Sequence, residues 1–153
     1  MTTLWRAILR DDPALARRVF FPEGAYVAMK TGAIADPTSD YTHRLLAFFN
    51  LDLATYHRWA GGGRLVRVEV DPTNAAWIRP GACENTIGYW HLPGVRLVVA
   101  RAHRVVSVGV FSLISWRGTY YVVHLGPNPR PVNAGTLDAP LLGAGSPGGA
   151  GGC

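Results

Sequence analysis

Apolar residues recur at helical spacing in the stretch before residue 61. They return every three or four positions, at Leu45, Leu46, Phe49, Leu53, Tyr56 and Ala60. This spacing gathers them on one face of a helix. Ser39-Asp40 can cap the helix, and Gly61-Gly62-Gly63 ends it. The sequence therefore predicts a long amphipathic helix whose apolar stripe needs a partner surface.

A shorter helix is predicted upstream of the long one. Asp11-Asp12-Pro13 combines an acidic N-cap with a proline in the first turn, where its missing N–H does no harm. We expect this helix to cover Pro13–Phe20 and to end near Pro22-Glu23-Gly24. Residues 2–9 can form another short helix before it, and segment 31–39 has the composition of a loop.

The second half of the chain shows the alternation of β-strands. Strands are predicted at about residues 64–70, 86–92, 95–101, 104–116 and 119–125. Two-residue links join the last four, at Pro93-Gly94, Ala102-His103 and Arg117-Gly118. Residues that pair across such links share a face of the sheet. In this register almost every residue of one face is apolar, including Trp90, Leu97, Val108 and Val123.

This sorting predicts an α+β domain over residues 1–125, with N-terminal helices packed on a curled antiparallel sheet of about five strands. The other face is mixed and needs cover from a second subunit, from the C-terminal tail or from a partner. We expect a homodimer through this outer face. Its interface residues would be Val98, Phe111, Leu113, Tyr120 and Val122.

The tail, residues 126–153, is rich in proline and glycine and would be flexible if nothing held it. Cys83 and Cys153 allow a single intramolecular pairing, or two free thiols. A terminal cysteine on a flexible tail favours the disulfide. Such a bond would contribute on the order of 4 kcal/mol and would indicate an oxidising compartment.

Composition restricts the function classes. With 48% hydrophobic and 16% charged residues the chain is a packed globule, and it has no apolar run of about 20 residues. Its first residues lack the features of a signal peptide, so either the protein is cytoplasmic or an export segment precedes them. The net charge of +5 comes from fourteen arginines and Lys30. These are scattered rather than aligned, so no nucleic-acid partner is expected.

No catalytic, metal or cofactor motif is present. The chain lacks a phosphate-binding glycine loop, a Gly-x-Ser-x-Gly elbow, a His-Glu-x-x-His pair and a Cys-x-x-Cys pair. We therefore assign no catalytic residue, metal site or cofactor. The candidate ligand-binding residues are polar or aromatic groups expected near the sheet ends: Tyr26, Glu84, Asn85, Trp90, Ser112 and Trp116.

Two histidines and one serine need separate comment. In the predicted register His91 and His124 lie on the first and last of four strands, about 14 Å apart, too far for a shared metal ion. Ser112 is the one polar residue on the apolar face. It either points into a pocket or bonds to the backbone where a helix packs closely.

Three segments resemble a known family. They are Phe20-Phe21-Pro22 with Ala25-Tyr26, Ile87-Gly88-Tyr89-Trp90, and Ser112–Gly118 with Tyr121–Leu125. Together they resemble an uncharacterised bacterial family of actinobacterial and myxobacterial proteins, some with export signals. The family has no established activity, so the resemblance implies no catalytic residues. It implies a secreted or cell-envelope location, with a cytoplasmic one as the alternative.

The order of helices and then sheet is similar to the NTF2-like and cystatin-like folds, which host enzymes and binding proteins alike. We expect a non-enzymatic binding or interaction domain that uses either the outer sheet face or the mouth of a cone-shaped cavity. The alternative is an NTF2-like enzyme acting on a small molecule in a cone-shaped pocket, with Glu84, His91 or Ser112 as polar groups. The enzyme needs a deep, partly apolar pocket with two convergent ionisable groups, whereas a filled interior favours a binding surface.

Overall fold

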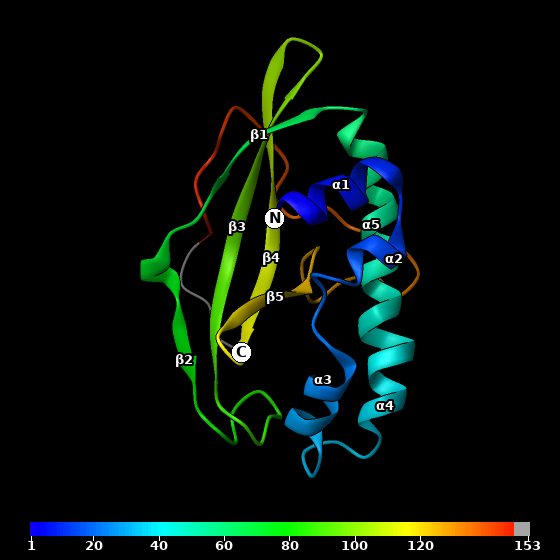
Figure 1. Cartoon of the computed structure of the whole chain (residues 1–153), viewed down its shortest axis with the longest axis vertical. Helices are drawn as coiled ribbons and strands as arrows, with labels where there is room; N and C mark the ends of the chain where they lie inside the picture. Colours follow the sequence, from blue (N-terminus) through cyan, green and yellow to red (C-terminus); the bar gives the residue numbers. More distant parts are fainter. Residues whose placement is uncertain (149–153) are drawn as a thin grey trace.

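The computed structural model describes residues 1–148, which form an α+β domain of N-terminal helices and a six-stranded antiparallel sheet (Figure 1). The helical elements are α1 (Thr2–Arg10), α2 (Pro13–Ala16), α3 (Glu23–Lys30), α4 (Pro37–Asp40), the π-helical segment η1 (Tyr41–Leu46), α5 (Ala47–Ala60) and the 3₁₀ turn η2 (Pro72–Asn74). The strands are β1 (Arg64–Glu69), β2 (Ala76–Ile78), β3 (Tyr89–Arg101), β4 (Arg104–Trp116), β5 (Thr119–His124) and β6 (Leu141–Leu142).

The long helix is confirmed, and all six residues of its predicted apolar stripe are buried. It runs without a break through α4, η1 and α5. Its first residue is Pro37, so the predicted cap Ser39-Asp40 lies inside the helix. Asp36 is the true N-cap, because its Oδ1 accepts a hydrogen bond from Ser39 N at 2.9 Å. Asp12 caps α2 in the same way, with Leu15 N at 2.9 Å.

The predicted helix over residues 13–20 is too long. It ends at Ala16 because Val19–Phe21 pairs with the free edge of β5: Val122 N donates to Val19 O and Phe21 N to Val122 O, both at 2.9 Å. Helix α3 was not predicted, although it buries Ala25, Tyr26 and Met29 at helical spacing. The sequence pattern that could have indicated α3 is the apolar spacing of these three residues after Pro22.

The hairpin predicted at Pro93-Gly94 is wrong. Both residues lie inside β3, which pairs with β4 in one unbroken register from His91↔Ile114 to Arg101↔Arg104. Gly94 has a φ of 61°, and a Cβ there would lie 2.4 Å from Gly148. The glycine therefore permits a kinked strand and the close approach of the tail, rather than a turn.

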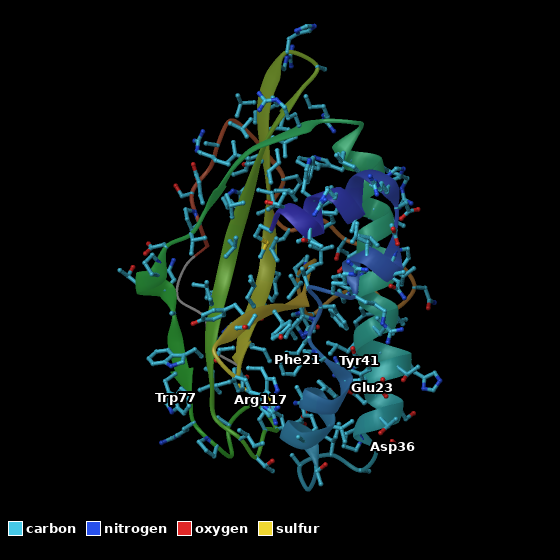
Figure 2. All side chains as sticks on the ribbon, in the orientation of Figure 1. Phe21, Glu23, Asp36, Tyr41, Trp77 and Arg117 are labelled. Atoms are coloured by element: carbon cyan, nitrogen blue, oxygen red, sulfur yellow. The ribbon has the colours of Figure 1, made fainter. Side chains whose placement is uncertain are left out.

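The other two predicted links are confirmed by the pairs Arg101↔Arg104 and Trp116↔Thr119. Because β3 continues through Pro93-Gly94, the residues before Pro93 do not all lie on the predicted face. Leu97 and Val108 are fully buried in the core, but Trp90 is 47% exposed and packs against Trp77 of β2. Figure 2 shows Trp77 on the side of the sheet away from the helices.

The sheet is not strongly curled, contrary to the prediction. Two 13-residue strands, β3 and β4, form its centre. The short strands β1 and β2 share the outer edge of β3, while β5 and β6 share the outer edge of β4. Because the sheet is only four strands wide at any level, little strand-to-strand twist accumulates across it.

The main core lies between the β3–β4 pair and the helices α1 and α5, which cover one side of the sheet (Figure 1). Alternate residues of both strands fill it: Val95, Leu97, Val99, Val106, Val108 and Val110. The one-sided helical cover of an antiparallel sheet is therefore confirmed.

Residues 126–136 of the tail pack against α5, and residues 138–148 follow the edge of β4 and reach the opposite face of the sheet. Leu142 pairs with Val106, and Gly109 N donates to Asp138 O at 2.8 Å. Arg96, which is buried, donates to Ala139 O of the tail at 2.9 Å. The tail thus covers the far face around Arg96 instead of extending into solvent, while Trp77, Trp90 and Tyr120 stay exposed.

This cover bears on the predicted homodimer. Val98, Leu113 and Val122 are buried within one chain, Phe111 is partly buried, and Tyr120 is exposed. Most of the apolar surface that motivated the dimer is therefore already covered. The oligomeric state stays a prediction.

The tail is anchored by a buried carboxylate on α5. Asp52 Oδ2 accepts from Gly126 N at 2.8 Å and pairs with Arg130, while Oδ1 accepts from Thr136 N at 2.8 Å. Both side chains of the ion pair are 1% exposed. Thr136 Oγ1 also donates to Asp52 Oδ1 at 3.3 Å, so four interactions of one side chain fix the start of the tail.

Two further predictions concern the ends of the fold. Cys153 lies outside the described residues, so its bond to Cys83 stays a prediction. Within residues 1–148, no helix has the length and apolar character needed to cross a membrane.

Candidate functional site

A cavity of about 900 Å³ lies between α3, the start of the long helix and one end of the sheet. Residues from α3, α4, η1, β3, β4, β5 and the tail line it. Its apolar wall consists of Phe21, Met29, Ile34, Phe111, Ile114 and Val123. The volume falls in the range of small-molecule sites, which are mostly apolar with a few placed polar groups.

The cavity reaches from the surface into the interior. Asp36, Glu84 and Asn128 are exposed and mark its mouth, whereas Met29 and Ser112 are buried. Asp36 lies at the end of the molecule where the long helix begins (Figure 2). A ligand would enter between this helix and the loop after residue 80.

A charged cluster stands on one wall. Arg44 donates from Nε to Asp40 Oδ1 and from Nη2 to Asp40 Oδ2, both at 2.6 Å, and from Nη2 to Tyr26 Oη at 2.9 Å. Tyr26 Oη also donates to Asp40. The hydrogen bond from Arg44 is the main reason why the pKa of Asp40 is lowered. Burial and Asp40 raise the pKa of Tyr26, so the phenol stays protonated.

The π-helical segment η1 contains Arg44, one turn after Asp40. A π-helical turn is uncommon and is often found at functional sites, because it changes the direction of side chains within a helix. The ion pair spans four positions, the spacing at which side chains meet on a helix. This wall is therefore preformed rather than assembled by a ligand.

The loop before β3 closes the second wall. Lys30 Nζ and Asn85 Nδ2 both donate to Cys83 O, at 2.9 and 2.8 Å, and Thr86 N donates to Met29 O at 2.7 Å. Cys83 and Glu84 have left-handed backbones, with φ of 53° and 54°. Two such residues in succession are energetically unfavourable, and the hydrogen bonds to α3 hold them. Burial lowers the pKa of Lys30.

The floor carries two histidines and a serine. His91 Nε2 lies 2.8 Å from Ser112 Oγ, and Ser112 is the cross-strand partner of His124. Because β3 is one strand, only β4 separates the two histidines. The two histidines are therefore two strand spacings apart, about 10 Å, instead of the three strand spacings predicted. Among residues 1–148 no cluster of His, Cys, Asp or Glu could hold a metal ion.

Both histidines are neutral near pH 7. Burial lowers the pKa of His91, and burial together with nearby cations lowers that of His124 to about 4. Within the described part of the chain, the ring nitrogens of His124 make no hydrogen bond, although the residue lines the cavity. Its N–H and its ring lone pair are therefore available to a bound molecule.

Four of the six predicted ligand-binding residues line this cavity: Tyr26, Glu84, Asn85 and Ser112. Trp90 and Trp116 lie elsewhere. Trp90 contacts Trp77, and Trp116 packs edge-on against Phe21 with its ring centroid 6.4 Å away. The sequence reasoning missed Lys30, Asp40 and Arg44. The four-residue spacing of Asp40 and Arg44 could have indicated that pair, whereas no local pattern indicates Lys30.

Comparison of the chain with protein-family models, with curated proteins and with solved structures finds no match.

Proposed function

We propose that this protein is a binding domain whose ligand is a small, largely apolar organic molecule held in the cavity. The observation that carries the proposal is the imidazole of His124, which makes no hydrogen bond to residues 1–148, in a cavity of about 900 Å³ with an apolar wall. A packed interior leaves few voids larger than a water molecule, so a cavity of this size with an apolar wall favours a ligand-binding site.

The polar groups support binding because most of them are already positioned. Arg44, Asp40 and Tyr26 hold one another, and Lys30 is fixed on the carbonyl of Cys83. A preformed site loses little conformational entropy when a ligand enters. The expected ligand therefore makes its hydrogen bonds at one end of the cavity, to groups that are already in place.

Filling the cavity tests this proposal. In Val123→Trp the indole would occupy the space of the ligand, and we expect the affinity for the neutral dye 1-aminoanthracene to fall at least about tenfold. Val132→Trp is the matched control, because Val132 is 68% exposed and lies outside the cavity. Dye fluorescence and circular dichroism of all three proteins measure binding and folding. Equal dye affinity in the folded Val123→Trp variant would rule the cavity out.

A second candidate is an enzyme that acts on the bound molecule, as for the NTF2-like proteins. It is favoured by one observation, the 2.8 Å contact between Ser112 Oγ and the neutral His91. Ser112 Oγ would attack an ester carbonyl while His91 Nε2 takes the hydroxyl proton and passes it to the leaving alcohol. Water, deprotonated by His91, would then release the acid from the serine.

We rank this candidate second because an enzyme needs the ligand-binding cavity and, in addition, a histidine base held in a fixed orientation. Within residues 1–148 the imidazole of His91 has no hydrogen bond besides the one to Ser112, so no second group orients it. A fluorophosphonate probe followed by mass spectrometry tests the pair. The enzyme requires labelling of Ser112 that is lost in His91→Gln and kept in Ser39→Ala. No label on Ser112 would remove the candidate.

The resemblance to the bacterial family and to NTF2-like and cystatin-like folds remains part of the proposal, and so does a secreted or envelope location. The disulfide between Cys83 and Cys153 belongs with that location, since such bonds persist in oxidising compartments. Thiol labelling of the denatured, unreduced chain tests it: we expect no labelled cysteine.

A further inference from the structure

The polar end of the cavity contains several hydrogen-bond donors close together. His91 and Ser112 are in contact, and the strand register places His124 directly across from Ser112. The hydrogen bond between His91 and Ser112 uses one of the two protons of that pair, so the pair can donate one hydrogen bond to a bound molecule and the neutral His124 a second. This arrangement suits an acceptor with more than one oxygen.

Three cationic side chains act on His124: Arg44 of η1, Arg130 of the tail and Lys30 of α3. Arg44 is paired with Asp40 and Arg130 with Asp52, whereas within residues 1–148 Lys30 makes no ion pair. The excess positive charge at this end of the cavity therefore comes from Lys30, and the imidazoles of His91 and His124 are uncharged.

The carboxylates of the cavity are either neutralised or distant from this end. Asp40 is paired with Arg44, and Asp36 and Glu84 are exposed at the mouth. Asp138 lies in the tail against Gly109, with its charge opposed by Arg96. An anion at His124 would thus meet donors and positive potential, while the alkyl part of the same molecule would contact Met29, Ile114 and Val123.

We propose, building on the binding function above, that the ligand is an amphipathic carboxylate whose oxygens lie at His91, Ser112 and His124 and whose hydrocarbon part fills the apolar wall. A charge-assisted hydrogen bond is about twice as strong as a neutral one. The site therefore distinguishes an acid from the alcohol of the same chain length.

The experiment compares three eight-carbon probes by displacement of 1-aminoanthracene at pH 7.5: octanoate, 1-octanol and octylamine. We expect octanoate to bind at least about tenfold more tightly than 1-octanol, and octylamine to bind most weakly. Replacing His124 by Phe should remove most of the difference between octanoate and 1-octanol while leaving the affinity for 1-octanol within about twofold. Thr119→Phe on the same strand, outside the cavity, should change neither affinity.

The outcomes separate this inference from the binding function. Equal affinity for octanoate and 1-octanol in the wild type would overturn the carboxylate preference and leave the cavity as a binding site. Tightest binding of octylamine would overturn it as well, since a cationic ligand would then be preferred. If the His124→Phe variant is unfolded, Ser112→Ala provides the same comparison. Failure of 1-aminoanthracene itself to bind the folded wild type would overturn the binding function, and this inference with it.

Discussion

Replacing Asp52 by Ala is expected to lower the free energy of unfolding by about 3–5 kcal/mol, because it leaves the buried Arg130 without its partner. The side chains of both residues are 1% exposed. The substitution also removes the acceptor for the backbone N–H groups of Gly126 and Thr136. These groups begin the tail, so the loss should free the segment that covers the far face of the sheet.

Urea unfolding followed by tryptophan fluorescence measures this effect. Glu69→Ala is the matched control, since it also removes a carboxylate paired with an arginine, Arg67, but Arg67 is exposed and Glu69 is only partly buried. Its effect should stay below about 1 kcal/mol. A loss of less than 1 kcal/mol in Asp52→Ala would contradict the anchored tail.

Acid is expected to destabilise the protein through His124. The pKa of this residue is about 4 in the folded chain and near 6.5 when it is exposed by unfolding. Between these values the unfolded chain binds a proton that the folded chain does not. Stability is therefore full above about pH 6.5 and falls as the pH drops towards 4, by about 3 kcal/mol at most from this residue.

The His124→Gln variant isolates this contribution, because glutamine keeps the polar character and does not titrate. We expect its free energy of unfolding to fall less steeply than that of the wild type between pH 7 and pH 4. The lowered pKa values of Asp40 and His91 act in the same direction in both proteins and cancel in the comparison. Parallel stability curves for the two proteins would show that His124 is not buried as described.

The sequence was sufficient for elements that local rules determine. The stripe from Leu45 to Ala60 follows from helical spacing, and the turns at Ala102-His103 and Arg117-Gly118 follow from turn chemistry. The prediction failed at Pro93-Gly94 because a Pro-Gly dipeptide can form a turn or, as here, a kink within a strand. A close approach by Gly148, a residue more than fifty positions away, decides between them, and no local pattern reveals it.

The candidate site was only partly predictable for the same reason. Tyr26, Asn85 and Ser112 were found as polar or aromatic groups near the sheet ends. The prediction divided β3 into two strands, which placed His124 one strand too far from His91. The role of the tail depended on Asp52, whose burial cannot be read from a helix that otherwise shows an ordinary polar face. Tertiary contacts, not propensities, place these residues.

The central claim is that a small molecule occupies the cavity between α3, the long helix and the sheet. Amide chemical-shift mapping of the ¹⁵N-labelled protein during titration with octanoate tests it most directly. The account predicts that the largest shifts cluster on the amides of Tyr26, Ser112 and His124, which line the cavity from three elements. Shifts centred instead on Trp77, Trp90 and Leu142, which are exposed apolar residues outside it, would contradict the account.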